Sequence, residues 1–409
     1  MAADSGNLYQ KLYTPLHPDL GTGPVSVEPY ISAEYFEREQ RRIFDNAWML
    51  ACAESEIPQP GSYLVKEVPL VNSSVIFARG ADGVVRGFRN VCRHRGNQLF
   101  YNECRGKARG FTCKFHGWHF ALDGKLRGVT EADRFFDLDK PGLGLTPVMV
   151  DTWNGLVFIN RGVGTVQPLR EYLGSLVDGL EQYPFKQMGL AAEWKVDVKA
   201  NWKVMIDAFQ EGYHVGLVHR NTVQGLFTGP KRPTCRLSHF RLHGPHRAVT
   251  TPKNPDFKPS TTEALAFQLA GAGLSQEAGE LHGSSGLQWS GLNPGGETDF
   301  GFDINIVFPA TFIDTSFGWF FTYEFWPQAV DRTFWVAKLF VVPPKTWAQR
   351  IGLEMTIIQL REALYEDLTT LEATQKGLSS GAMDTIMLSD QELALRHQHA
   401  VVEKMVRGA

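Results

Sequence analysis

Apolar side chains follow two different spacings in the first 160 residues. In residues 31–49 they recur at helical intervals, and one side of the predicted helix consists of Tyr35, Phe36, Ile43, Phe44 and Trp48. From about residue 48 to residue 160 they occur in short runs rich in β-branched and aromatic residues, separated by Pro, Gly, Asn and Asp. This change predicts a short helix followed by a small all-β domain.

The rest of the chain, from about residue 163, mixes the two patterns. Residues 301–343 are strand-like throughout, and their aromatic and β-branched content favours an antiparallel sheet. Helices are predicted at 169–183, 200–215, 346–376 and 389–406, with a further strand at 193–200. Residues 251–300 are rich in Gly, Ser, Pro and Thr and are expected to form a long loop or lid. The second part is therefore predicted to be a sheet flanked by helices.

The composition is that of a water-soluble globular protein. The chain has 409 residues, of which 43% are hydrophobic and 21% charged, so it can bury large cores and is expected to form more than one domain. A net charge of −3 without a basic run argues against nucleic-acid binding. No apolar stretch is long enough to cross a membrane, and the start of the chain has no signal-peptide pattern, so a cytoplasmic location is expected. Five cysteines do not make a disulfide framework.

Four metal-binding side chains stand in two mixed pairs within the predicted all-β domain. Cys92 and His94 belong to the run CRHRG, and Cys113 and His116 belong to the run CKFHGWHF. A Rieske [2Fe–2S] centre requires this set, because two thiolates hold one iron and two imidazoles hold the other. A structural zinc site is the alternative, since zinc also binds Cys2His2 sets, although zinc fingers usually pair cysteine with cysteine and histidine with histidine.

A second candidate metal site contains His214 and His219, which are five residues apart. On an ideal helix this spacing turns the two side chains about 140° apart, so both face one metal only if the helix is distorted or ends between them, which Gly216 allows. Asp207, Glu211 and His214 are spaced four and three residues apart and are expected on one helical face. Two histidines and one carboxylate form the donor set of non-haem Fe(II) sites.

The third ligand is expected in the helix predicted at 346–376. An apolar stripe of that helix consists of Leu360, Leu364, Asp367 and Leu371. A carboxylate on the core face needs a partner, so Asp367 is the candidate ligand, and an ion pair with a buried Lys or Arg is the alternative. Glu366 is expected on the polar face, towards solvent, and is the less suitable ligand.

Both motif blocks resemble those of Rieske non-haem iron ring-hydroxylating oxygenase α subunits. CRHRG and CKFHGWHF are similar to the Rieske signature of that family, with Lys114 where the family often has proline. The family's mononuclear-iron motif is matched by Asn201, Trp202, Lys203, Tyr213, His214 and His219, and its C-terminal aspartate by Asp367. In the family, an acid three residues before the first histidine bridges the two metal centres. Here that acid is Glu211, where many ring dioxygenases have Asp, and Glu is similar to members acting on quaternary ammonium compounds and to some others.

The resemblance covers roughly residues 40–400 and implies an α+β protein. An N-terminal helical segment (1–45) is expected to pack on the catalytic domain. An all-β Rieske [2Fe–2S] domain is expected at 46–162, and a catalytic mononuclear-iron domain with a central antiparallel sheet flanked by helices at 163–409. The implied cluster ligands are Cys92, His94, Cys113 and His116, and the implied Fe(II) ligands are His214, His219 and Asp367. Glu211 is expected to pass electrons, and Asp207 to relay protons, orient a metal-bound histidine or cap a helix.

The resemblance also implies the terminal oxygenase component of a Rieske system. Such a protein uses O2 and electrons from a ferredoxin or flavin reductase, and NAD(P)H acts only indirectly, through the separate reductase. A small apolar substrate is expected, and the aromatic-rich second domain favours ring dioxygenation of an aromatic compound. The alternative, suggested by Glu211, is monooxygenation or oxidative demethylation of a methoxyarene or a quaternary ammonium compound. A homotrimer, or an α3β3 assembly with a small β subunit, is implied.

Two other classes of function compete with the oxygenase: an electron carrier without catalysis, and a zinc-stabilised binding module. A hypothesis on the electron donor rests on basic residues near the Rieske loops, which would dock an acidic ferredoxin: Arg93, Arg95, Arg105, Lys107, Arg109 and Lys114. Strand alternation divides the aromatic residues of 311–336 between core and substrate pocket, and the sequence does not distinguish the two faces.

Overall fold

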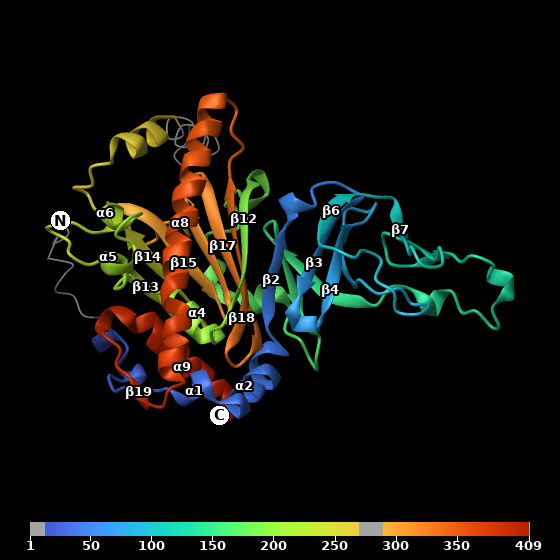
Figure 1. The fold of residues 1–409 in the computed structure, drawn as a ribbon, viewed down its shortest axis with the longest axis horizontal. Coiled ribbons are helices and arrows are strands. Elements are labelled where there is room, and N and C mark those ends of the chain that lie inside the picture. Colours follow the sequence, from blue (N-terminus) through green and yellow to red (C-terminus); the bar gives the residue numbers. More distant parts are fainter. Residues whose placement is uncertain (1–12, 270–288, 409) are drawn as a thin grey trace. The chain divides into compact units, whose positions relative to one another are not determined.

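The computed structural model describes residues 13–269 and 289–408, so the predicted loop at 251–300 lies partly outside the described residues. Two compact units make up the fold. The β unit comprises Phe44–Tyr172 and Phe185–Gln187. The mixed unit comprises the described parts of Met1–Ile43, Leu173–Pro184 and Met188–Ala409. Figure 1 shows the helices and strands of each unit.

The β unit is built from antiparallel strands, as predicted. Its larger sheet has seven strands in the order β2-β11-β10-β5-β4-β3-β6, and its smaller sheet has three in the order β7-β8-β9. The strands are β2 (Trp48–Ala53), β3 (Ser62–Val68), β4 (Ser73–Arg79), β5 (Val85–Arg89), β6 (Cys104–Lys107), β7 (Gly110–Thr112), β8 (His119–Ala121), β9 (Leu126–Gly128), β10 (Pro147–Trp153) and β11 (Leu156–Asn160). One core cluster contains Cys92, Cys113, Trp118 and Phe120, so the predicted metal-binding loops are anchored in the interior.

The mixed unit is organised around a seven-stranded antiparallel sheet in the order β12-β18-β17-β16-β15-β14-β13. Its strands are β12 (Gly189–Val198), β13 (Ser238–His243), β14 (His246–Pro252), β15 (Phe300–Val307), β16 (Thr311–Ser316), β17 (Trp319–Ala329) and β18 (Arg332–Val341). A separate two-stranded pair joins β1 (Val25–Ser26) to β19 (Thr385–Ile386). The predicted central antiparallel sheet is therefore confirmed.

Helices α4 (Trp202–Phe209) and α8 (Trp347–Leu378) contact this sheet, and the long helix α8 crosses in front of it in Figure 1. The other labelled helices are α1 (Glu28–Ile31), α2 (Ala33–Glu39), α5 (Val215–Val218), α6 (Gln224–Phe227) and α9 (Leu393–Arg407), with α3 (Leu169–Leu173) in the sequence between the two sheets. Residues 261–269 are also helical. The predictions at 346–376 and 389–406 correspond to α8 and α9.

Three predicted helices are shorter in the structure. The helix expected at 31–49 divides into α2 and a π turn at Gln40–Phe44, and Trp48 opens a strand. The helix expected at 169–183 ends at Leu173. The helix expected at 200–215 ends at Phe209, because the chain at Gly212 passes so close to another segment that an added Cβ would lie 2.6 Å from the Cys235 carbonyl oxygen.

The register of the central sheet decides which aromatic residues face the helices. On β17, Phe321, Tyr323 and Phe325 lie on one face, and their cross-strand neighbours on that face include Asp314 and Phe312 of β16 and Trp335 of β18. Phe209 of α4 contacts the rings of Tyr323, Phe325 and Trp335, with centroid distances of 5.0, 5.8 and 5.3 Å. The odd-numbered residues of β17 are thus the ones that face α4.

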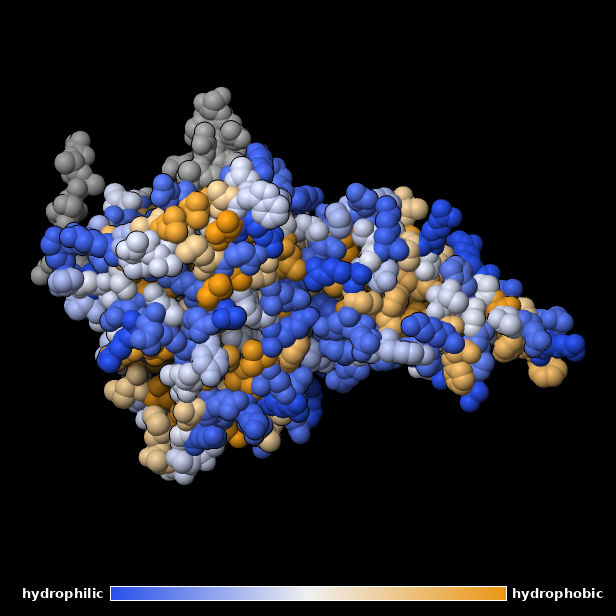
Figure 2. Space-filling model, turned by 45° about the horizontal axis from the view of Figure 1, so that its top comes forward, coloured by the Kyte–Doolittle hydropathy of each residue, from blue (hydrophilic) through white to orange (hydrophobic). Residues whose placement is uncertain are grey.

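None of the helices in residues 13–269 and 289–408 combines the length and the apolar character needed to cross a membrane. On the face drawn in Figure 2, hydrophobic residues occur in groups among hydrophilic ones.

Candidate metal centres

The start of α4 is fixed by the Asn-Trp-Lys motif. Asn201 caps the helix, because its side-chain oxygen accepts a hydrogen bond of 2.9 Å from the Lys203 backbone N–H. Trp202 Nε1 and Lys203 Nζ both donate to the carboxylate of Glu39 in α2, at 2.8 and 2.7 Å. The Glu39 and Lys203 side chains are almost completely buried, at 0% and 2% exposure. This buried ion pair holds α4, and with it the candidate iron ligands that follow.

Sequence reasoning missed Glu39, although a signal was present. Glu39 lies four residues after Tyr35 and four before Ile43, so it belongs to the apolar stripe of its predicted helix. The same argument selected Asp367 in α8.

His214 and His219 flank a single helical turn. His214 directly precedes α5 and His219 directly follows it, and the two rings lie 5.2 Å apart at an angle of 69°. The predicted interruption of the helix therefore exists, but it lies between Phe209 and His214 rather than at Gly216, which is inside α5. Ending α4 early lets both imidazoles turn towards the same point.

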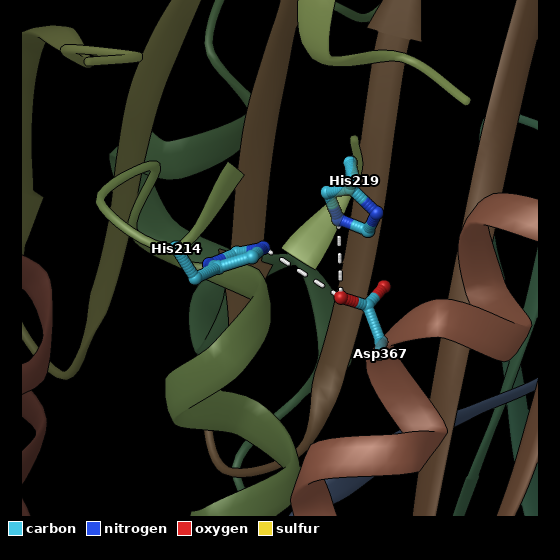
Figure 3. Close-up of side chains that lie close together, drawn as sticks. All are labelled: His214, His219 and Asp367. Atoms are coloured by element: carbon cyan, nitrogen blue, oxygen red, sulfur yellow. Dashed lines mark ion pairs between the residues drawn. The ribbon is translucent and has the colours of Figure 1, made fainter. Parts of the chain in front are cut away.

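Asp367 completes the group from α8. Its Oδ1 lies 3.1 Å from His219 Nε2 and 3.6 Å from His214 Nε2, and both contacts converge on that one oxygen in Figure 3. The candidate ligand atoms of the three residues all lie within 4.8 Å of one another. Within the described ranges, the ion pairs of Asp367 are with these two histidines and not with a Lys or Arg. A carboxylate oxygen and two imidazole nitrogens that meet at one point fit a non-haem Fe(II) ion.

A carboxylate holds the far nitrogen of each histidine. Glu211 contacts His214 Nδ1 and also accepts from the backbone N–H groups of Tyr213 and His214. Glu366 contacts His219 Nδ1 at 3.0 Å and accepts from Thr222 Oγ1 at 2.6 Å through the same oxygen. An acceptor at Nδ1 places the proton there and leaves Nε2 free to bind a metal ion.

The expectation that Glu366 faces solvent is wrong. Its side chain is only 16% exposed, because Glu366 and Asp367 follow one another on α8 and contact the two nitrogens of one imidazole ring, that of His219. Burial disfavours the charged form of His219, but the hydrogen bonds and charges of Asp367 and Glu366 outweigh this and raise its pKa. A helical wheel separates polar from apolar positions, but it does not show which polar position contacts another segment of the chain.

Asp207 does not share a face with Glu211 and His214, because α4 ends before both of them. It belongs instead to a buried polar network. Tyr30 Oη donates to Asp207 at 2.5 Å and contacts His399 Nε2 at 2.7 Å. The amides of Gln210 and Gln398 also donate to Asp207. Both amide oxygens accept from Arg247, so two glutamines connect Asp207 to this cation.

Burial raises the pKa of Asp207 to about 7, and the Tyr30 hydrogen bond and the Arg247 charge act in the opposite direction. The network joins α1, α4, α9 and β14 immediately before Glu211. The hydrogen bonds of Asp207 are with Tyr30, Gln210 and Gln398 and not with His214 or His219, so the role predicted for it in orienting a metal-bound histidine has no direct contact behind it among the described residues.

The two cysteine–histidine loops share one backbone hydrogen bond and one glycine conformation. The N–H of Gly96 donates to the Cys92 carbonyl at 3.0 Å, and the N–H of Gly117 donates to the Cys113 carbonyl at 3.0 Å. Both glycines have positive φ, 77° and 75°, which suits glycine at the end of a tight ligand loop. Cys92 and Cys113 are 3% and 2% exposed, and their thiols are close enough to hydrogen-bond.

The imidazoles of the same loops also lie together. The His94 and His116 rings are 4.6 Å apart, and His94 stacks on Trp118 at 4.8 Å and 8°. His94 Nδ1 is buried and has no hydrogen-bond partner among the described residues, as a nitrogen reserved for a metal would be. Thiols paired on one side and imidazoles paired on the other fit a two-iron cluster. In the part of the chain that the structure describes, these four side chains do not converge on one point as the His214 group does, which argues against a single zinc ion.

Comparison with known protein families decides between the classes. The model of the ring hydroxylating α subunit (catalytic domain) matches residues 185–408, and the model of the Rieske [2Fe–2S] domain matches residues 47–149. The chain belongs to the ring-hydroxylating α-subunit family. This result confirms the family that the two motif blocks resemble, the α+β fold and the two iron cofactors. A Rieske electron carrier or a zinc-binding module does not account for the catalytic domain of this family.

Curated relatives of this α subunit include members with different substrates. It is 34% identical over 193 residues to the carnitine monooxygenase oxygenase subunit of Acinetobacter baumannii, covering 46% of this chain and 51% of that protein. It is 32% identical over 198 residues to the glycine betaine monooxygenase oxygenase subunit of Pseudomonas aeruginosa, covering 48% and 45%. The large component of a naphthalene 1,2-dioxygenase from Pseudomonas aeruginosa is 35% identical over 199 residues, covering 47% and 43%. The chain thus spans about half the length of the curated relatives it matches.

Solved structures agree on the fold of this α subunit. The quaternary ammonium Rieske monooxygenase CntA in complex with an inhibitor superposes with a TM-score of 0.73 at 22% identity, covering 96% of this chain and 99% of that chain. The naphthalene 1,2-dioxygenase from Rhodococcus sp. bound to indole gives 0.73 at 21% identity, covering 98% and 99%. Both comparisons support the fold and leave the substrate open.

Proposed function

We propose that this chain is the terminal oxygenase component of a Rieske non-haem iron system. The observation that carries the proposal is the convergence of His214, His219 and Asp367 within 4.8 Å, in a chain that also has a Rieske domain. These three residues would hold the mononuclear Fe(II). The [2Fe–2S] cluster would be held by Cys92, His94, Cys113 and His116.

When bound at this site, Fe(II) supplies the activation of O2 that organic side chains cannot provide. The protein's own contribution is to position the donors. Glu211 and Glu366 keep the two imidazoles in the tautomer whose Nε2 is free, and Asp367 presents a carboxylate oxygen to both nitrogens. Phe209 and Tyr323 provide an apolar wall on the sheet side of α4.

We infer that the electrons come from a separate ferredoxin or flavin reductase. The Rieske domain supports this inference, since a [2Fe–2S] cluster carries electrons that another protein supplies. Glu211, which contacts His214 and occupies the position of the acid that bridges the two centres in the family, would pass them on to the iron site. A homotrimer, in which the Rieske domain of one subunit serves the iron of the next, remains a prediction. Light scattering of the purified holoenzyme tests it.

For the reaction, we favour monooxygenation of a quaternary ammonium compound over aromatic ring dioxygenation. Glu in place of Asp at position 211 supports this choice, as do the carnitine and glycine betaine monooxygenase relatives. Aromatic faces also attract such cations, which carry no N–H to donate. In a monooxygenation one oxygen atom enters a C–H bond of the substrate and the other leaves as water, with two electrons from the reductase and two protons.

Ring dioxygenation is the second candidate, because a naphthalene 1,2-dioxygenase component is similar over a comparable length. Turnover of the reconstituted holoenzyme with a surrogate reductase and labelled O2 separates the two. The panel contains glycine betaine, carnitine, methoxyarenes and aromatic hydrocarbons. We expect one labelled oxygen, or loss of a methyl group, in a cationic substrate. Two labelled oxygens in an aromatic product would establish the second candidate instead, and reoxidation of the cluster without any labelled product would contradict both.

A further inference from the structure

Asp314 is a buried carboxylate on the same face of the sheet as the aromatic residues that contact α4. It lies on β16, is 5% exposed, and its Oδ1 has no hydrogen-bond partner among the described residues. The neighbouring carboxylate Asp303 is also buried, but it has several hydrogen-bond partners. It accepts from Thr250 Oγ1 at 2.5 Å, from the Asn293 N–H at 2.6 Å and from Arg241 at 3.4 Å.

The register places these two acids on opposite faces. Asp303 pairs with Thr315, and Asp314 pairs with Ile304 on one side and with Phe321 on the other. Asp314 therefore lies with Phe312, Phe321 and Tyr323, on the face that α4 covers. The rings of Phe312 and Phe321 are 6.1 and 4.7 Å from that of Tyr323.

Tyr323 connects this carboxylate to the candidate iron site. Burial raises the pKa of its phenol well above the ordinary value, and the charges of Asp314 and Asp367 raise it further. Tyr323 pairs across the strands with Phe312, two residues before Asp314, so the ring and the carboxylate lie on one face of the sheet. The same ring contacts Phe209, five residues before the candidate ligand His214.

A carboxylate in this position is costly to the ligand-free protein. Burying an ionised group without a counter-charge costs several kcal/mol, so such a group is neutral or awaits a cation. The charge that acts on Asp314 is the like charge of Asp303, which raises its pKa in addition to burial. A carboxylate beside aromatic faces matches the chemistry of a quaternary ammonium group, which needs a counter-charge and π faces rather than hydrogen-bond acceptors.

We propose that Asp314 is a specificity-determining residue that receives the cationic group of the substrate beside Phe321 and Tyr323. This inference rests on the proposed action on quaternary ammonium compounds. The counter-charge then belongs to a residue outside the motifs of the family. The protein should accordingly distinguish ligands by the charge of their head group rather than by its shape.

The test compares cations with neutral molecules of the same shape. Glycine betaine and 3,3-dimethylbutanoate differ only in the central atom of the head group, nitrogen or carbon, and so do choline and 3,3-dimethylbutan-1-ol. Their dissociation constants are measured by calorimetry on the holoenzyme. Wild-type protein is expected to prefer the cation in at least one pair. Asp314→Asn should reduce the ratio of cation to neutral affinity by about 30-fold, the effect of removing one partner of a buried charge pair.

Two further variants complete the test. Asp314→Glu keeps the charge and should keep the preference for the cation. Asp303→Asn removes a carboxylate from the opposite face, so it should lower the melting temperature, and because it also removes the like charge that disfavours ionised Asp314, it should not reduce the preference for the cation. Asp314→Asn should melt at or above the wild-type temperature, because it removes an unpaired buried acid.

The outcomes separate the two levels of the proposal. If wild-type protein prefers neither cation to its neutral isostere, the proposed substrate class fails and this inference fails with it. If wild-type protein prefers the cation and Asp314→Asn retains the full ratio, only the role of Asp314 is refuted. A marked loss of thermal stability in Asp314→Asn would also count against it, since that result means that the carboxylate has a structural partner.

Discussion

Replacing Glu366 tests whether the outer carboxylate of His219 prepares the iron site. In Glu366→Ala, His219 Nδ1 loses an acceptor at 3.0 Å and Thr222 Oγ1 loses the same acceptor at 2.6 Å. The ring can then rotate or take the tautomer with a proton on Nε2. Loss of such a partner lowers metal affinity by about 10- to 100-fold, which corresponds to about 1.4–2.7 kcal/mol. Glu366→Gln keeps a hydrogen-bond acceptor of similar size, so its effect should be smaller.

The assay is anaerobic Fe(II) titration of protein from which the mononuclear iron has been removed, with a competing chelator. The visible spectrum of the [2Fe–2S] cluster serves as an internal control for folding of the Rieske domain. Glu362→Ala is the matched control, because Glu362 lies on the same helix, pairs with Arg361 and has a 49% exposed side chain. Equal Fe(II) affinity in Glu366→Ala and Glu362→Ala would refute the positioning role.

Three other predictions follow from the described contacts. Glu39→Gln leaves Lys203 buried without its counter-charge and should lower the free energy of unfolding by about 3–5 kcal/mol in a urea titration, whereas Glu37→Gln, which breaks an exposed pair with Arg41, should cost less than about 1 kcal/mol. Because the pKa of Asp207 is raised to about 7 in the folded protein and is near 4 when unfolded, the native state binds the extra proton between these values, and stability should fall as the pH rises through this window. Asp207→Asn should remove this pH dependence of stability. The unfolding free energy of the variant minus that of wild type should therefore become more positive from pH 5 to pH 8. A constant difference would contradict the assignment. Reversing the charges of Lys107 and Arg109 should slow reduction of the cluster by an acidic ferredoxin in stopped-flow measurements, more at low than at high ionic strength, and an unchanged rate would contradict the docking hypothesis.

The elements predicted most accurately are those whose hydrophobic pattern extends over many residues. The apolar stripe through Leu364, Asp367 and Leu371 predicted both the extent of α8 and the burial of its carboxylate. The strands of 301–343 also appear as predicted, because aromatic and β-branched runs favour extended backbone wherever they are half-buried. The short ligand loops of the β unit were recognisable from chemistry, since few sites need one cysteine and one histidine from each of two loops.

Sequence reasoning failed where the deciding contact joins segments far apart in the chain. The end of α4 at Phe209 depends on the close approach of Gly212 to Cys235, which no periodicity reveals. The misplacement of Asp207 followed from that error, because a continuous helix would have aligned it with Glu211 and His214. Glu366 was placed in solvent for a related reason: its partner, His219, is 147 residues earlier in the sequence.

The buried carboxylates of the mixed unit can be sorted by what balances their charge, and this sorting separates structural from functional roles. Glu39 has a lysine at 2.7 Å, so its charge is balanced within the fold and it serves as an anchor. Asp207 is surrounded by amides and a phenol, with burial raising its pKa, so it is balanced mainly by a proton. Glu211, Glu366 and Asp367 contact the imidazoles of His214 and His219. The negative charge of these carboxylates is fully balanced only when a metal ion binds to the two imidazoles. Burial and the charge of Asp303 raise the pKa of Asp314, and its Oδ1 has no hydrogen-bond partner among the described residues, so a proton balances it in the ligand-free protein and, in the proposal above, the substrate cation takes the place of that proton.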